Sequence, residues 1–362
     1  MLKKRFFCLF LAVWLITGAI VSLCACNGDG DDDGTEPPDG AFDPYPYEDL
    51  SVFMDLPDYK NITLEGALVD RMVSTELAYF CRDKSLDVQI YDGGAQRWDV
   101  ADLTVKGFVD GEIDYELCSE GIEIVLGSAS FYIDGLEQAV IGMEVGESKT
   151  VDLTFPTDYP GTKYAGKNVQ YHVTLNALYR APTLTDAMVS QNTGFDSADE
   201  YVSWVRSRCI FLYVWDGLVT KCVIKSYPSE YTEYYQYLKG TIQQKAEDAG
   251  YSLADFISKF GDAYGQYGLF SGMTLIDLED VCTNYARSNL VNDLLTYSII
   301  RAEGIKTEGA EFEAAKVLLT KDLGGISYET VVASQGETEA IISVLSIRLC
   351  QVINSYVTVT NE

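Results

Sequence analysis

The sequence predicts an α+β protein in which a mainly β segment is followed by a mainly helical one. Two observations support this prediction. Short runs that alternate polar and apolar residues, separated by turn signals, crowd into residues 93–181. Apolar residues at helical spacing fill residues 182–362. With 362 residues, 47% of them hydrophobic, the chain is long enough for two or three domains with sizeable cores.

The first 25 residues have the pattern of a bacterial lipoprotein signal peptide. Three basic residues at 3–5 precede the uncharged run 6–23, and Leu23-Cys24-Ala25-Cys26 is similar to a lipobox. We expect cleavage before Cys26 and lipidation of its thiol, which anchors the protein at the extracytoplasmic face of a bacterial cell membrane. An uncleaved transmembrane helix is the alternative, because 18 apolar residues can just span a bilayer.

Residues 26–48 are rich in Gly, Asp and Pro and are predicted to be a disordered acidic tether. Asp29, Asp31 and Asp33 are similar to the start of a calcium loop. Gly40, however, occupies the twelfth position, where such a loop needs a bidentate Glu. The segment is therefore expected to be a linker and to bind no metal.

Composition excludes several classes of function. The formal net charge of -29 repels phosphate backbones, so no nucleic-acid partner is expected. His172 is the only histidine, so a His-based metal cluster cannot form, and no phosphate-binding glycine motif follows a strand. No cofactor is predicted. The cysteines beyond residue 26 are widely spaced and are expected to be mostly buried thiols; they are Cys81, Cys118, Cys209, Cys222, Cys282 and Cys350.

Local signals place the elements of the β segment and of the stretch before it. Residues 49–92 are expected to give an extended piece at 52–57 and a helix over 64–82. Asp110-Gly111 is a hairpin turn signal. The remaining expected elements of residues 93–181 are a short strand at 122–126, a short helix at 135–141, and strands at 150–155 and 169–175.

Residues 182–362 show repeated helix-start signals. Ser197-Ala-Asp-Glu200 and Ser334-Gln-Gly-Glu337 are capping-box sequences, and Pro228 is expected to open another helix. Apolar stripes at helical spacing include Val291, Leu294, Leu295 and Ile299, and a last one from Ile342 to Tyr356.

A glycine-punctuated stretch connects residues 93–181 to a known family. Gly135, Gly142-Met-Glu-Val-Gly146 and Phe155-Pro-Thr-Asp-Tyr159 follow one another with a short helix and a strand between them. This order resembles the FKBP-type peptidyl-prolyl cis-trans isomerases, and most closely their trigger factor branch. Val109-Asp-Gly-Glu112 upstream and Tyr164-Ala-Gly-Lys167 downstream match the same family. The resemblance implies an FKBP-like antiparallel sheet around a short helix.

The resemblance also implies site residues. Ile133 matches the isoleucine whose backbone amide binds a carbonyl, Leu136 matches the aromatic pocket floor, and Tyr159 matches the tyrosine of the Phe-Pro loop. The other candidates stand where the family has aromatic side chains; they are Tyr171, Ile122, Val105 and, in a segment of unclear register, Tyr115. Leu136, Val105 and Ile122 each replace an aromatic, so we expect a shallower and less polarisable pocket.

The implied reaction suits a chain with one histidine. Rotation about an X-Pro bond crosses a barrier of about 18–20 kcal/mol that amide resonance sets. Moving the amide into an apolar pocket and twisting it weakens that resonance without a general base. A peptidyl-prolyl isomerase therefore needs none of the acid–base groups that this sequence lacks.

The helical segment 182–362 resembles the C-terminal chaperone domain of trigger factor, into which the FKBP-type domain is inserted. That layout implies that residues 49–92 pack on the helical domain. It also implies unfolded or nascent secreted polypeptides with X-Pro bonds as partners, and tyrosines 231, 234, 235 and 237 are either a client surface or part of the core. A signal peptide and acidic tether replace trigger factor's ribosome-docking domain, so no ribosome binding is expected. The alternatives are a non-catalytic holdase with a degenerate pocket and a surface binding lipoprotein.

Overall fold

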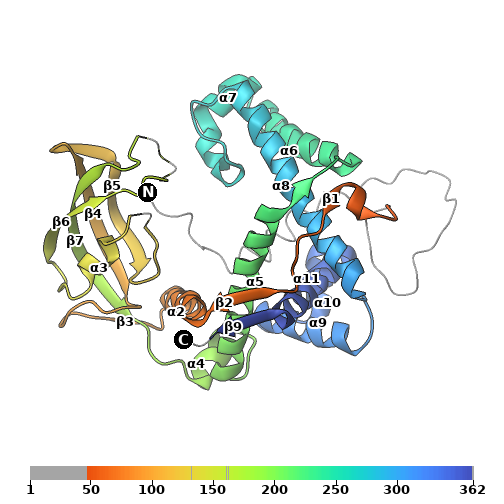
Figure 1. The fold of residues 1–362 in the computed structure, drawn as a ribbon, viewed down its shortest axis with the longest axis horizontal. Coiled ribbons are helices and arrows are strands. Elements are labelled where there is room, and N and C mark those ends of the chain that lie inside the picture. Colours follow the sequence, from red (N-terminus) through yellow and green to blue (C-terminus); the bar gives the residue numbers. More distant parts are fainter. Residues whose placement is uncertain (1–46, 132, 160, 162, 361–362) are drawn as a thin grey trace.

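The computed structural model describes residues 47–360 apart from residues 132, 160 and 162 (Figure 1). The predicted signal peptide, Cys26 and nearly all of the acidic tether therefore lie outside the described residues. Within them, an antiparallel sheet domain and a larger helical part confirm the predicted α+β class. None of the helices in the described residues has both the length and the apolar character to cross a membrane.

The sheet domain is organised around one long strand, β7 (Asn168–Arg180). One side of β7 pairs with β4 (Val100–Val109), and β4 pairs in turn with β5 (Glu112–Val125). The other side pairs with β6 (Ser148–Thr154) and, near its end, with β3 (Val88–Gln89). The short helix α3 (Leu136–Val140) shares a buried core with the inner face of this sheet. An FKBP-like sheet around a short helix is thus confirmed.

The β4–β5 hairpin confirms one sequence prediction and corrects another. Asp110 and Gly111 have φ values of 54° and 84°, as the tight turn that joins two paired strands requires. The predicted strand 122–126 is only the end of β5, which extends back to Glu112. Register shifts on either side of Val105 break the two-residue alternation, so the first half of β5 lacks the pattern expected of a strand.

Helices make up nearly all of the chain after β7. In chain order they are α4 (Asp186–Asn192), α5 (Ala198–Lys221), α6 (Ser229–Asp248), α7 (Leu253–Phe260), η2 (Gly261–Tyr267), α8 (Leu275–Glu303), α9 (Ala310–Asp322), α10 (Tyr328–Gln335) and α11 (Glu337–Ser355). The strand β8 (Val223–Ile224) lies between α5 and α6.

These helices form two separate cores. We call α6, α7, η2 and the first half of α8 the arm, which projects away from the rest in Figure 1. Its small core consists of Leu238, Ile242, Ala246, Phe256, Ile257, Leu269, Leu278 and Cys282. We call the remaining helices the body, whose larger core draws on α5, the second half of α8, α9 and α11.

The segment before the sheet domain belongs partly to the body. The 3-10 helix η1 (Leu50–Val52) is followed by β1 (Met54–Asp55), which pairs with β8, and β2 (Ile62–Glu65) pairs in parallel with β9 (Val357–Thr360). The helix predicted from residue 64 is α2 (Gly66–Asp83), since that pairing holds residues 64 and 65 in β2.

Helix α2 contacts both the body and the sheet domain. Val69 and Val73 lie in the body core, whereas Ala78 packs with Val100 and Val125 of the sheet. The Arg82 guanidinium lies 3.4 Å from the Tyr179 ring centroid and pairs with Glu123 at 2.6 Å. Both faces of α2 are therefore occupied.

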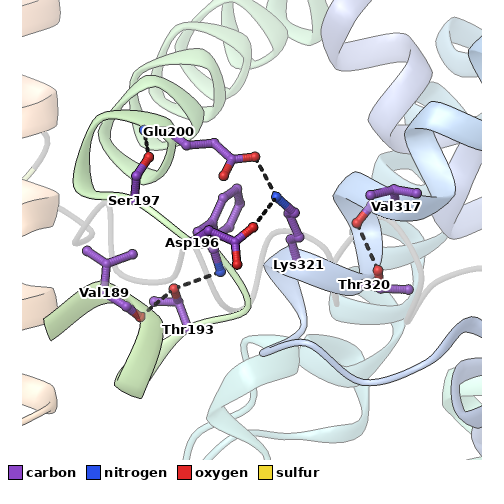
Figure 2. A network of polar contacts seen from close by, with 9 residues as sticks. Val189, Thr193, Asp196, Ser197, Glu200, Val317, Thr320 and Lys321 are labelled. Atoms are coloured by element: carbon purple, nitrogen blue, oxygen red, sulfur yellow. Dashed lines mark hydrogen bonds and ion pairs between the residues drawn. The ribbon is translucent and has the colours of Figure 1, made fainter. Parts of the chain in front are cut away.

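One predicted helix cap is confirmed and the other is wrong. Ser197 Oγ accepts a hydrogen bond from Glu200 N at 3.2 Å at the start of α5, while the Glu200 carboxylate accepts from Lys321 Nζ of α9 at 2.7 Å (Figure 2). Ser334, by contrast, lies in the last turn of α10 and donates to the Val331 carbonyl. Gly336, with φ of 91°, is the N-cap of α11, so a helix does begin at Glu337 but Ser334 does not cap it.

Candidate active site

The candidate site is built on the inner face of β7. Val169, Tyr171, Val173 and Leu175 are buried, and the residues between them point to the outer face. This is the two-residue alternation of a strand with one face on a core. It places His172 on the outer face, where its ring lies 4.5 Å from that of Phe108. The only histidine is therefore not part of the site.

Gly107 leaves room for the side chains of Tyr171 and Leu117 from the two neighbouring strands. It pairs with Tyr171 of β7 on one side and with Asp114 of β5 on the other, so the three positions form one row. A Cβ at position 107 would lie 2.5 Å from the Leu117 Cβ and 3.1 Å from Tyr171 Cε1. The Tyr171 ring and Leu117 therefore occupy the space that any other residue at 107 would need.

The helix α3 and the loop before it close the opposite wall. Ile133 and Leu136 are 3% and 0% exposed and lie in the same core as Tyr171. The Glu137 carboxylate accepts hydrogen bonds from the backbone N–H of Gly127, Ala129, Ser130 and Phe131. Because a carboxylate presents four lone-pair positions, one side chain satisfies this whole turn of the loop. Glu137 thereby fixes the chain that leads into Ile133.

Three aromatic rings follow strand β6. The Phe155 ring centroid lies 4.7 Å from that of Tyr159 and 5.6 Å from that of Tyr164. Backbone hydrogen bonds hold the loop, with Phe155 N donating to Lys167 O and Tyr159 N donating to Pro156 O. Phe155 is fully buried and Tyr159 only partly, so Tyr159 is the ring nearest to solvent.

A charged group of four side chains borders the aromatic rings. The Tyr164 hydroxyl donates to Asp114 at 2.9 Å and to Glu116 at 2.7 Å, and Lys163 Nζ pairs with both carboxylates. Burial raises the pKa of Asp114, but hydrogen bonds from Lys163 and Tyr164 outweigh it and leave that pKa below its usual value. Burial raises the pKa of Tyr164 to about 12. At neutral pH this border therefore holds two carboxylates and a protonated phenol.

The structure brings most of the predicted site residues together. Those in one buried core are Val105, Ile133, Leu136 and Tyr171, with Ile122 and Tyr159 packed against it. Tyr115 lies apart from them and is 79% exposed. Its neighbour Asp114 reaches the site instead, because the irregular register of β5 turns residue 114, and not residue 115, toward Tyr164.

Several residues at the site were absent from the sequence candidates. They are Phe155, Tyr164, Asp114, Glu116, Lys163 and Glu137. The motif Phe155-Pro156 pointed at the first of them. The ion pairs are invisible in the sequence, because Asp114 and Lys163 lie on different elements that only the fold brings within 3.0 Å.

The tyrosines near the start of α6 divide between the core and the surface. Tyr234 is 2% exposed and its hydroxyl donates to Asp293, whereas Tyr237 is 41% exposed. Tyr231 packs against the body core and Tyr235 against the arm core. Tyr237 is therefore the one whose ring is open to a partner.

Comparisons with known proteins agree with this geometry. Residues 93–176 match the family model of the FKBP-type peptidyl-prolyl cis-trans isomerase. Trigger factor of Desulforamulus reducens is 26% identical over 268 residues, which cover 71% of this chain and 60% of that protein. Trigger factor of Pseudomonas fluorescens is 32% identical over 154 residues, or 40% of this chain and 35% of that protein.

The chain spans about 60% of the length of the first of these relatives. Trigger factor of Brevibacillus brevis is similar, at 27% identity over 72% of this chain and 61% of that protein. A solved structure of the trigger factor chaperone, reported for promiscuous substrate recognition in folding and assembly, aligns with 83% of this chain and 72% of its own. The two chains are 13% identical in sequence and superpose with a TM-score of 0.26.

Proposed function

Since this chain is a relative of trigger factor that carries an FKBP-type peptidyl-prolyl cis-trans isomerase domain, we propose that it is a folding factor that isomerises X-Pro bonds and holds unfolded chains. The observation that supports the isomerase part is one shared core. Val105, Ile133, Leu136 and Tyr171 come from two strands, a helix and the loop before that helix, and they lie in one buried core against which Tyr159 packs.

The isomerase reaction follows from an apolar wall with few polar groups. A prolyl ring packed on Leu136 and Val105 leaves water, and its amide then loses part of the resonance stabilisation that the polar solvent supports. The sequence resemblance implies that the Ile133 backbone N–H binds a peptide carbonyl. No step needs a proton to move, so the outward-facing His172 is no obstacle.

Exposed apolar side chains on the arm support the holding activity. Tyr251, Phe260, Phe270, Leu275 and Ile276 are between 37% and 75% exposed. The backbone at Gly261, next to Phe260, lies against the backbone of Phe270. A Cβ at position 261 would be only 2.3 Å from Phe270 backbone atoms. We call these five residues the arm patch. Apolar side chains kept in solvent on a small helical unit fit an unfolded client, whose own apolar side chains are exposed.

We propose that the protein works outside the cytoplasm, attached to the cell membrane by a lipid on Cys26. The basic residues 3–5, the apolar run 6–23 and the lipobox-like cysteine support this location. Its clients are then secreted polypeptides that emerge unfolded from the membrane. A Cys26→Ser variant expressed in a bacterium tests this: wild type but not the variant should incorporate labelled fatty acid and remain in the membrane fraction.

A refolding assay limited by proline isomerisation tests the catalytic part. Wild-type protein at micromolar concentration should accelerate the slow phase of a client that folds through a trans-to-cis X-Pro step. Ile133→Ala is unsuitable as a probe because it opens a cavity, whereas Leu136→Met conserves volume and should change the rate less than twofold. An unchanged slow phase with wild type would remove the enzymatic claim.

The second candidate is a holdase without catalysis. The observation that favours it is the closure of the pocket wall, since Leu136 and Val105 are both aliphatic and 0% exposed. It predicts suppressed client aggregation with no change in the slow refolding phase. If the protein neither suppresses aggregation nor accelerates refolding, but binds a defined ligand, it is a surface binding lipoprotein instead.

A further inference from the structure

The hydroxyl of Tyr171 has no hydrogen-bond partner among the described residues, although the side chain is 0% exposed. A buried unsatisfied hydroxyl is destabilising, and phenylalanine would fill the same space without that cost. The sequence resemblance places a phenylalanine at this position in the family. The extra oxygen therefore needs an explanation that packing alone does not supply.

The groups around the Tyr171 hydroxyl include residues of the candidate active site. Burial raises the pKa of Tyr171, and so do the Tyr159 and Tyr164 phenols, the Cys118 thiol and the Asp114 carboxylate. The hydroxyl therefore stays protonated and can donate a hydrogen bond. Tyr171 lies on the buried inner face of β7, in the same core as Phe155 and Tyr164, and therefore points away from the outer face of the sheet.

Neighbouring groups leave the donor free for a ligand. Tyr164 already gives its proton to Asp114 and Glu116, and Lys163 pairs with both of those carboxylates. Cys118 Sγ donates to the Asp114 backbone carbonyl at 3.3 Å. The acceptors around Tyr171 are thus engaged with other donors.

We propose that the Tyr171 hydroxyl donates a hydrogen bond to a main-chain carbonyl oxygen of the bound X-Pro peptide. A neutral carbonyl fits better than an anion, because Asp114 and Glu116 place negative charge beside the site. Every X-Pro segment carries such a carbonyl, so the contact suits many clients. Tyr159 is the partly exposed ring of the set, and the peptide reaches the hydroxyl past it.

The inference rests on the proposed isomerase function and adds a polar contact to a pocket that has lost aromatic rings. Val105 stands where the family has tyrosine or phenylalanine, and it pairs across β4 and β7 with Val173, the residue two positions from Tyr171. The Tyr171 hydroxyl on β7 therefore gives this wall of the pocket a polar group, which Val105 on β4 does not provide.

The test compares binding of a fluorescent proline peptide to the full chain and to Tyr171→Phe. The variant should bind about 3- to 10-fold more weakly. Its melting temperature should equal or exceed that of wild type, since no partner is lost in the free protein. Tyr201→Phe is the matched control. Tyr201 packs against Phe80 of α2 and against the body core, whereas Tyr171 lies in the core of the sheet domain. Loss of the Tyr201 hydroxyl should therefore leave the affinity unchanged.

A thioxo peptide isolates the carbonyl contact. Replacing the oxygen of the residue before proline with sulfur weakens the acceptor, so wild type should lose affinity and Tyr171→Phe should lose much less. Equal losses in both proteins would overturn the inference. So would a Tyr171→Phe variant that melts lower but binds normally, since the hydroxyl would then have an internal partner such as water. Wild type that binds no proline peptide overturns the proposed function itself.

Discussion

The sheet domain buries the apolar side chains of its candidate site, whereas the arm leaves several apolar side chains exposed. In the sheet domain the candidate pocket residues Val105, Leu136 and Tyr171 are all 0% exposed. In the arm, Phe270 and Ile276 remain 55% and 75% exposed beside a core of only eight buried residues. We infer that the arm is ready to meet an unfolded chain as it stands, whereas the pocket must open to admit one.

The largest effect is expected from a cavity in the arm core. Leu278→Ala removes a fully buried side chain from that small cluster and should cost about 2–5 kcal/mol. Hydrogen exchange should show α6 and α7 opening while β4 to β7 stay protected. Equal loss of protection in the sheet domain would mean that the two regions unfold as one unit, which would break the comparison.

A substitution that overpacks the sheet domain should destabilise that domain and leave the arm unchanged. Gly107→Ala places a Cβ 2.5 Å from the Leu117 Cβ, and overpacking of this kind costs about 1–3 kcal/mol. Urea denaturation followed by Tyr fluorescence, together with hydrogen exchange, should report lower stability of the sheet domain only. Gly217→Ala is the matched control, because no atom lies within 4 Å of a Cβ there and alanine favours the helix α5.

Helix α2 connects the sheet domain to the body and carries a pH-dependent group. Burial raises the pKa of Glu76 to about 7, which the nearby Arg208 only partly offsets. In the unfolded chain this carboxyl ionises near its ordinary value of 4.5. The folded protein therefore loses stability as pH rises from about 4.5 to about 7, and the full loss persists above that range.

Glu76→Gln removes that ionisation. It should raise the free energy of unfolding by as much as about 3 kcal/mol at pH 8, where the carboxylate is charged, and change it little at pH 4.5. Thermal melts at both pH values measure the difference. The same gain at both values would show that contacts of the amide, and not the charge, are responsible.

The smallest change in stability is expected from the arm patch. The double variant Phe270→Ser and Ile276→Ser alters side chains that are mostly in solvent, so its free energy of unfolding should stay within about 0.5 kcal/mol of wild type. Suppression of client aggregation should nevertheless fall several-fold. Val317→Ser, which makes the same kind of change at a 57% exposed apolar side chain of α9 outside the patch, serves as the matched control. Normal suppression by the double variant would place client binding elsewhere.

Much of the fold was predictable because local signals agreed with tertiary structure. The Asp110-Gly111 turn, the alternation along β7 and the N-cap at Ser197 all behave as the sequence suggests. The predictions were wrong where the end of an element did not follow the local sequence signal. Ser334 lies at the end of α10 and does not start a helix. Residues 64 and 65 lie in β2, because that strand pairs with β9 near the other end of the chain.

At the site, the apolar residues were predictable and the polar ones were not. Ile133, Leu136 and Tyr171 follow glycine-marked motifs whose order along the chain is visible. The pairing of Lys163 with Asp114 depends on the irregular register of β5. The Tyr171 hydroxyl lacks a hydrogen-bond partner among the described residues because its neighbours are bonded to one another. Both are properties of the assembled sheet.

In the location that we propose, the chain itself emerges unfolded from the membrane, and the pairing of β2 with β9 then has a consequence for the order of folding. Thr360 Oγ1 of β9 donates to the Leu64 carbonyl of β2, a contact between residues 296 positions apart. The strands of the sheet domain are contiguous in sequence, so that domain can form before the helices behind it have emerged. β2 must wait until β9 has emerged. The protein is therefore expected to complete its body last, and to depend meanwhile on the same protection from aggregation that we propose it gives to others.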